Sequence, residues 1–221
     1  MLRSITREKP FEEVVRLLGE VERVFIIGCG TCTTMARTGG QTEVLAMKEK
    51  LQGTHKVVTG TSVIPVACDN LTEEMVRQNL PAMRDSQALL VMTCAFGVQT
   101  LARFLDLPAI PALDTLFIGK ELGVGLYQEV CIQCGECILG ETGGICPVTS
   151  CHKGLVNGPC GGTNNGKCEV DRNKDCAWTL IYERLQKQGR LSAMRKFQPA
   201  KNYQVEPKPG QIVFAPERGA S

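Results

Sequence analysis

Cysteine is the residue type in this sequence with the clearest chemical potential, because twelve of the 221 residues are cysteines. Eight of them fall between Cys131 and Cys176, a stretch of 46 residues that also holds nine glycines and no long periodic apolar run. Such a stretch cannot bury enough apolar surface to offset the entropy of ordering its backbone. We therefore expect bonds from the cysteine sulfurs to hold it together.

The N-terminal residues carry charges throughout and lack the apolar segment of a secretory signal. No apolar run approaches the roughly 18 residues of a membrane span. We expect a cytoplasmic protein without membrane insertion, and in that reducing compartment cysteines are more often metal ligands or redox groups than disulfides. The net charge of +2 and the aromatic content of 5% give no reason to expect a nucleic-acid partner.

The spacing Cys131-x-x-Cys134-x-x-Cys137 is the strongest local signal. It is more typical of a [4Fe–4S] cluster than of zinc, which is usually bound by pairs of cysteines. Cys146, followed by Pro147, resembles the cysteine-proline ligand of bacterial ferredoxins, although eight residues rather than three separate it from Cys137. The other candidate ligands in this stretch are Cys151, Cys160, Cys168 and Cys176.

These eight cysteines can make two metal sites of four ligands each. One partition gives the first site Cys131, Cys134, Cys137 and Cys176, and leaves the second Cys146, Cys151, Cys160 and Cys168. The sequence does not fix the partition, because ligands cross over between sites in two-cluster ferredoxins. Zinc stays an alternative, since a tetrahedral zinc site uses the same four sulfurs. The many glycines are expected to let backbone N–H groups approach the sulfurs.

The other four cysteines are spread over the first hundred residues, but each follows a predicted strand. Three apolar runs predict buried strands of a parallel sheet: Val24–Ile27, Val57–Val66 and Ala88–Met92. Cys29 and Cys32 lie in the loop after the first run, and Cys68 and Cys94 follow the second and third. Because the carboxyl ends of parallel strands meet at one edge, these four thiolates can converge on a third cluster or a zinc ion.

Other interpretations of this edge stay open. Gly28-x-Gly30 after a strand is typical of a dinucleotide-binding loop, but Thr33 occupies the place of the third glycine. A redox pair of the thioredoxin type in the C-x-x-C spacing is a second possibility, and it leaves Cys68 and Cys94 without a role. Each of these two cysteines, taken alone, could also be a buried structural residue.

The elements that must position the cysteines alternate between strand and helix, which predicts an α/β fold of the Rossmann or flavodoxin-like kind. The expected helices are Pro10–Leu18, Gln41–Leu51, Asn70–Met83, Gly97–Leu105 and Ala177–Arg190. Thr115–Ile118 is expected as a fourth strand and the glycine-rich Gly119–Gly125 as a boundary. We predict an α/β domain at 1–125, a cysteine-rich cluster-binding module at 126–178, and a C-terminal helix with an extended, partner-binding tail at 179–221.

Several longer motifs resemble those of one family. They are GCGTCTT at Gly28–Thr34, CAFGVQ at Cys94–Gln99, PALDTLFIG at Pro111–Gly119, GGICP at Gly143–Pro147 and KGLVNGPCGGTNNGKCEV at Lys153–Val170. Over roughly residues 10–195 the chain resembles the small iron–sulfur subunit, MetV type, of two-subunit methylenetetrahydrofolate reductases. Ala95 stands where glycine is commoner in that family, which leaves the ligands untouched.

The resemblance implies an electron-transfer subunit with two or three [4Fe–4S] clusters, zinc being possible at one site. Its partner would be a TIM-barrel subunit that binds FMN or FAD and reduces 5,10-methylene-tetrahydrofolate to 5-methyl-tetrahydrofolate in one-carbon metabolism, such as the Wood–Ljungdahl pathway. Electrons would come from ferredoxin or another donor complex. The sequence shows no folate, flavin or acid–base apparatus, so we do not expect catalysis by this chain alone. One alternative is a structural zinc-binding assembly subunit. Another is thiol or corrinoid-methyl chemistry at an open metal site at the N-terminal set, and the complete set of four cysteines there argues against it.

Overall fold

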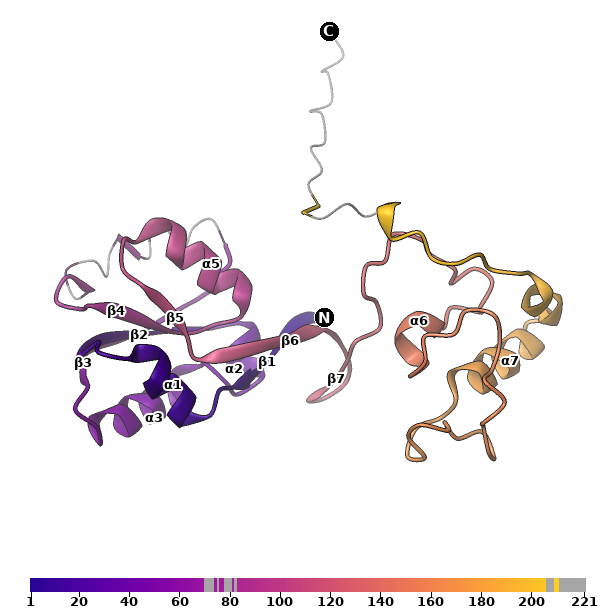
Figure 1. Ribbon diagram of the computed structural model, residues 1–221, viewed down its shortest axis with the longest axis horizontal. Helices are drawn as coiled ribbons and strands as arrows, with labels where there is room; N and C mark the ends of the chain where they lie inside the picture. Colours follow the sequence, from indigo (N-terminus) through magenta and orange to yellow (C-terminus); the bar gives the residue numbers. More distant parts are fainter. Residues whose placement is uncertain (70–73, 75, 78–80, 82, 206–208, 211–221) are drawn as a thin grey trace, which may run out of the picture. The chain divides into compact units, whose positions relative to one another are not determined.

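The computed structural model describes residues 1–69, 74, 76–77, 81, 83–205 and 209–210 (Figure 1). The chain divides into two compact units, Met1–Gln128 and Glu129–Ser221. Each unit carries some of the cysteines and is described by itself. Within the described residues, no helix is both long and apolar enough to cross a membrane.

A four-stranded parallel sheet forms the centre of the first unit. Its strands are β2 (Arg23–Cys29), β3 (Val57–Ile64), β4 (Ala88–Met92) and β5 (Ala109–Pro111), in the order β3-β2-β4-β5. All three pairings are parallel, which confirms the predicted α/β fold. Nearly every residue of β2 and β4 is buried, as expected for strands covered on both faces.

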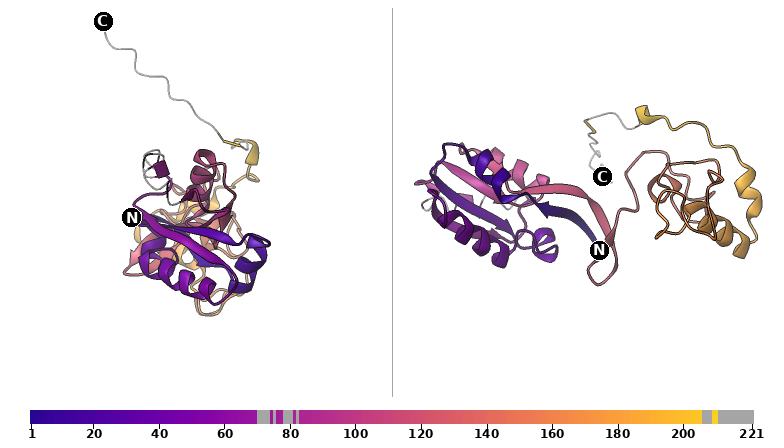
Figure 2. Two further views of the ribbon diagram at one scale, coloured as in Figure 1. Left: turned by 90° about the vertical axis from the view of Figure 1, so that its left-hand side faces the viewer. Right: turned by 60° about the horizontal axis from the view of Figure 1, so that its bottom comes forward.

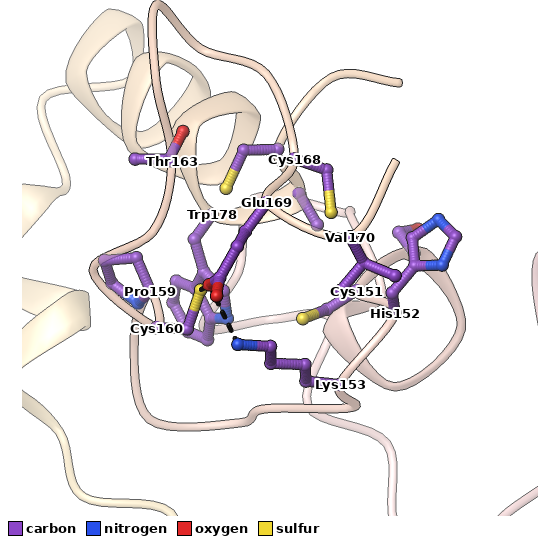
Figure 3. A pocket seen from close by; sticks show the side chains of 13 residues that line it. Cys151, His152, Lys153, Pro159, Cys160, Thr163, Cys168, Glu169, Val170 and Trp178 are labelled. Carbon is purple, nitrogen blue, oxygen red and sulfur yellow. Dashed lines mark hydrogen bonds and ion pairs between the residues drawn. The ribbon is translucent and has the colours of Figure 1, made fainter. Parts of the chain in front are cut away.

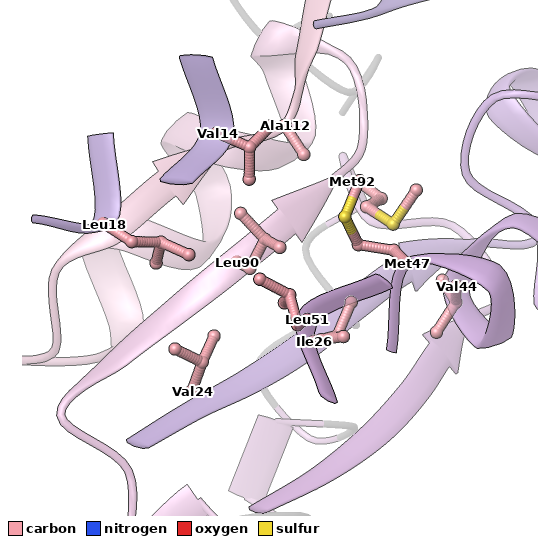
Figure 4. Packing of buried hydrophobic residues seen from close by; sticks show 10 residues of the cluster. All are labelled: Val14, Leu18, Val24, Ile26, Val44, Met47, Leu51, Leu90, Met92 and Ala112. Atoms are coloured by element: carbon pink, nitrogen blue, oxygen red, sulfur yellow. The ribbon is translucent and has the colours of Figure 1, made fainter. Parts of the chain in front are cut away.

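Helices cover both faces of this sheet (Figures 1 and 2). They are α1 (Phe11–Leu18), the short α2 (Cys32–Met35), α3 (Gln41–Gln52) and α5 (Ala95–Phe104). One cluster of fully buried side chains joins α1 and α3 to the sheet, for example Leu18 and Leu51 against Leu90 (Figure 4). A second cluster on the opposite face joins Leu101 of α5 to Leu89. The predicted helices are confirmed, except for Asn70–Met83, which lies mostly outside the described residues.

An antiparallel sheet, which the sequence did not predict, completes the first unit. Its strands are β1 (Leu2–Glu8), β6 (Leu113–Gly123) and β7 (Leu126–Gln128), in the order β1-β6-β7. Thr115–Ile118 is a strand, as expected, but it lies in β6 and pairs antiparallel with β1 instead of joining the parallel sheet. The fourth parallel strand is the three-residue β5, which was too short for its pattern to be seen. Most of the expected boundary Gly119–Gly125 likewise belongs to β6.

The second unit has little regular structure and a small core. Its described residues form α6 (Pro147–Ser150), α7 (Ala177–Lys187) and two short 3₁₀ helices, η1 (Leu191–Arg195) and η2 (Tyr203–Val205). Its hydrophobic cluster is built on Trp178, Ile181 and Leu185 of α7. The indole N–H of Trp178 donates to the carbonyl of Leu155 at 2.9 Å, which ties α7 to the cysteine-rich loops. The predicted tail, Pro199–Ser221, lies outside the described residues at 206–208 and from 211 onward.

Candidate metal centres

The first set of cysteines lies at the carboxyl edge of the parallel sheet. Cys29 is the last residue of β2, Cys32 begins α2, Cys68 follows β3, and Cys94 directly precedes α5 after β4. The strands end level with one another, since Cys29 pairs with Ile64 and the residue before it pairs with the last residue of β4. In the sheet order β3-β2-β4-β5, the chain passes from β2 to β3 on one side and continues through β4 and β5 on the other. The strand order therefore reverses between β2 and β4, and α/β folds bind ligands at such a point.

Short hydrogen bonds fix the loop that carries Cys29. Its N–H donates to the carbonyl of Gly39 at 3.0 Å, and its own carbonyl accepts from the hydroxyls of Thr34 at 2.6 Å and Thr33 at 3.1 Å. The Thr33 hydroxyl, which is fully buried, also lies 3.4 Å from the carbonyl oxygen of Met92. A Cβ at Gly39 would collide with that same carbonyl. The C-x-x-C loop is thereby held against the end of β4.

The thiol of Cys68 is influenced by the charges of the other three cysteines of the first set. Partial desolvation of this otherwise exposed residue raises its pKa above the ordinary value, and the thiols of Cys94, Cys29 and Cys32 raise it further by charge repulsion. Cys29 and Cys94 are buried, Cys32 is half-buried, and Cys68 is exposed. Four thiolates in one place repel one another unless a cation neutralises them, so this arrangement fits a metal group.

The second set lines one pocket in the second unit. Its members are Cys131, Cys134, Cys137 and Cys146. The chain curls around Cys134 through left-handed backbone at Gln133 (φ 52°) and Gly135 (φ 78°). The backbone N–H of Gln133 donates to the sulfur of Cys131 at 3.4 Å, while the thiol of Cys134 donates to the carbonyl of Glu136 at 3.7 Å. N–H donors aimed at sulfur are a means by which proteins stabilise thiolate ligands.

Two glycines bring Cys146 back to this loop. Gly143 and Gly144 have φ of 61° and 84°, and the Gly144 N–H donates to the carbonyl of Leu139 at 3.0 Å. The cysteine then precedes Pro147, the first residue of α6. The structure thus groups Cys146, and not Cys176, with the C-x-x-C-x-x-C loop, which differs from the partition considered from the sequence.

The third set lines a separate pocket of the second unit (Figure 3). Its members are Cys151, Cys160, Cys168 and Cys176. A tight turn at Asn165 (φ 49°) and Gly166 (φ 75°) brings two of them together. Cys168 donates its N–H to the carbonyl of Lys174 at 2.9 Å, and Cys176 donates to Gly166 at 2.7 Å. Asn-Gly is the strongest sequence signal for such a turn, so this element could have been predicted from the sequence.

The surroundings of Cys176, in the third set, favour its thiolate form. Burial acts to raise the pKa of its thiol, but hydrogen bonds outweigh burial and lower the pKa below the ordinary value. The donors are the backbone and hydroxyl of Thr179, the backbone of Trp178, and the hydroxyl of Thr163. Cys176 directly precedes α7, and the N-terminus of a helix also favours a thiolate.

An ion pair borders the third set. The thiol of Cys160 donates to Oε2 of Glu169 at 3.0 Å, and the ammonium of Lys153 donates to the same oxygen at 2.8 Å. The hydrogen bond from Lys153, followed by that from Cys160, lowers the pKa of the Glu169 carboxyl. His152 also lines this pocket and is exposed, as expected for a loop histidine.

All twelve cysteines lie in the described part of the chain, and all are free thiols. Among the residues described, no three or more His, Cys, Asp or Glu side chains form a group that could hold a single metal ion. A zinc ion with Zn–S bonds of ~2.3 Å needs sulfurs only about 3.8 Å apart. A [4Fe–4S] cluster places irons and sulfides between its ligands and spaces the thiolates more widely. The sulfurs of the second and third sets share pockets, but among the described residues they do not form an ion-sized cage.

Residues 110–204 match the family model described as methylene-tetrahydrofolate reductase C terminal. This part of the chain is therefore similar to the C-terminal part of methylenetetrahydrofolate reductases, over less than half of its length. The match includes β6 and both cysteine pockets of the second unit, whereas the cysteines at the edge of the parallel sheet lie before it. No curated protein and no solved structure matches the chain.

Proposed function

We propose that the protein is the electron-transfer iron–sulfur subunit of a methylenetetrahydrofolate reductase complex. It would pass electrons from ferredoxin or another donor complex to the FMN or FAD of a TIM-barrel catalytic subunit. That subunit would reduce 5,10-methylene-tetrahydrofolate to 5-methyl-tetrahydrofolate. The observation that carries the proposal is the grouping of twelve cysteines into three sets of four, two of them in the segment related to these reductases.

The donor atoms support iron–sulfur ligation. Each set offers sulfur ligands, which suit iron–sulfur clusters or zinc and not the hard cations that prefer oxygen. The Gln133 N–H that faces the Cys131 sulfur at 3.4 Å is the kind of contact that tunes such a group. When bound, [4Fe–4S] clusters would supply one-electron uptake and release. The chain's own residues would hold them, limit the access of water and set their potentials.

The exposure of the first set supports electron exchange with another protein. Cys29 and Cys94 are 5% and 6% exposed, so the inner side of this set is covered by the fold. Cys68 is exposed, so the outer side can be approached. Interfaces of electron-transfer proteins are small and transient, and one exposed edge is sufficient for such an encounter.

Metal analysis after anaerobic purification tests the proposal. With two or three clusters we expect about eight to twelve irons and as many sulfides per chain, and EPR signals after reduction with dithionite. Variants that remove one ligand from each set, C94A, C134A and C168A, should each lose about four irons. Ser192→Ala, an exposed position of η1, is the matched control and should lose none.

Zinc in place of iron in the metal analysis would contradict the proposal. Near-zero iron with stoichiometric zinc would exclude a redox role and favour a subunit whose metal sites only brace the catalytic partner. Transfer of electrons gives a second readout. The reduced wild-type subunit should reduce the flavin of its co-purified partner in a stopped-flow experiment, and C134A should do so more slowly or not at all.

A further inference from the structure

The chain that follows α7 runs back along the first cysteine loop of the second unit. The guanidinium of Arg190 donates to the carbonyl of Gly140 at 2.9 Å, and the ammonium of Lys196 donates to Glu141 at 2.6 Å. Further on, Gln198 and Asn157 exchange two hydrogen bonds of 2.7 and 2.8 Å. We call residues 190–202 the return segment. Its residue Lys201 lines the pocket of the second set, so the return segment borders these cysteines.

Lys201 is the residue of the return segment that enters the cysteine pocket. It is half-buried and lines the same pocket as the second set, Cys131, Cys134, Cys137 and Cys146. Its ammonium donates to the backbone carbonyl of Glu136, and the next residue, Asn202, donates its N–H to Oε2 of Glu136 at 2.9 Å. The cation is therefore held against the loop that connects Cys134 to Cys137.

The ammonium of Lys201 has a different kind of partner from the ammonium of Lys153, the lysine beside the third set. There the ammonium of Lys153 forms an ion pair with Glu169 at 2.8 Å, so a carboxylate offsets its charge beside the thiols. The ammonium of Lys201 donates to a neutral backbone carbonyl instead. The carboxylate of Glu136, which also lines this pocket, accepts from the N–H of Asn202. Thiolate ligands of the second set would therefore lie near the Lys201 ammonium, which the cysteine loop itself holds in place.

We propose that Lys201 is a positioning residue that supplies positive charge to the redox centre held by Cys131, Cys134, Cys137 and Cys146. This inference rests on the proposed function. When the centre takes one electron from the donor, no bond forms or breaks and no proton is taken up, so one negative charge is added. A nearby ammonium stabilises the reduced state more than the oxidised state, because its attraction grows with that charge. Lys201 therefore raises the reduction potential of this centre.

The test is an EPR-monitored redox titration of the anaerobically purified full chain, with dithionite as reductant. C134A identifies the signal of this centre by its absence. Lys201→Gln should lower the midpoint of that signal by the equivalent of about a tenfold change in equilibrium, or about 59 mV for one electron. Lys201→Arg should keep it near the wild-type value. Lys196→Gln is the control, because Lys196 pairs with Glu141 and is not among the residues that line the cysteine pockets.

The outcomes separate this inference from the proposed function. An unchanged midpoint in iron-loaded Lys201→Gln overturns the role of Lys201 and leaves the iron–sulfur function standing. Loss of iron from this set in Lys201→Gln but not in Lys201→Arg supports the role of its charge. Equal loss in both variants overturns it, since shape and not charge would then matter. Zinc in place of iron in the wild-type protein overturns both proposals.

Discussion

Gly97 of α5 lies so close to Ala67 that a Cβ added to the glycine would come within 2.9 Å of the Cβ of Ala67. Ala67 immediately precedes Cys68, and Gly97 lies in the first turn of the helix that begins after Cys94. The absence of a side chain at Gly97 therefore lets the start of α5, which follows Cys94, pack against the residue that precedes Cys68. Glycine is needed at position 97 for close packing and not for its backbone angles, because Gly97 does not have a positive φ.

Substituting Gly97 by alanine should disturb the first set more than the stability of the fold. Alanine favours a helix over glycine by about 1 kcal/mol, whereas overpacking costs roughly 1–3 kcal/mol, so the two effects partly cancel. The loop that carries Cys68 must still move away. We expect G97A to lose about four irons and G97V to lose them more completely, measured by iron analysis. G123A, where a Cβ meets nothing within 4 Å, should keep the wild-type iron content.

The stability of the metal-free, reduced protein should fall at alkaline pH because of Cys68. Burial, followed by the charges of the neighbouring thiols, raises the pKa of this group above its ordinary value of 9.0. The native state then holds a proton that the unfolded state releases, so stability is full below pH 9 and declines as pH rises toward the raised pKa. Urea unfolding across this range should show the decline, and C68S should show a smaller one. An equal decline in C68S would contradict the assignment.

The parallel sheet and its cysteine edge could be predicted from the sequence because their signals are local. The apolar runs of β2 and β4 are continuous and bounded by glycine or polar residues, which identifies buried strands. Once the strands are parallel, the topology alone places Cys29 and Cys94 at the same edge. Cys68, which follows β3, is placed at this edge by the same rule.

Pairings between distant segments could not be predicted in this way. The antiparallel sheet joins Ser4 to Ile118, and nothing local in either strand names the other as its partner. The grouping of Cys146 with the first cysteine loop depends on left-handed backbone at Gly143 and Gly144. Glycine permits such backbone but does not require it, so the sequence left the partition of the eight cysteines open.

Thr179 should control the acidity of Cys176 in the metal-free protein. Its backbone N–H and its hydroxyl both favour the thiolate, and together with Trp178 and Thr163 they lower the pKa despite burial. Replacing the hydroxyl by a methyl group in T179V should raise the pKa of Cys176 toward its ordinary value. The rate of alkylation of this cysteine by iodoacetamide, followed by peptide mass spectrometry between pH 6 and 10, would show the shift. A pH profile identical to that of the wild-type protein would contradict this role.

The turn at Gly166 should be required for the third set of cysteines. Its φ of 75° is costly for residues with a side chain, by about 1–2 kcal/mol, and its carbonyl accepts the N–H of Cys176 at 2.7 Å. We expect G166A to shift Cys168 and Cys176 apart and to lose about four irons, with the EPR signal of the second set unchanged. Gly140 offers the matched control, because a Cβ there meets nothing within 4 Å and its φ is not left-handed. Full iron content in G166A, or the same loss in G140A, would show that this turn does not position the ligands.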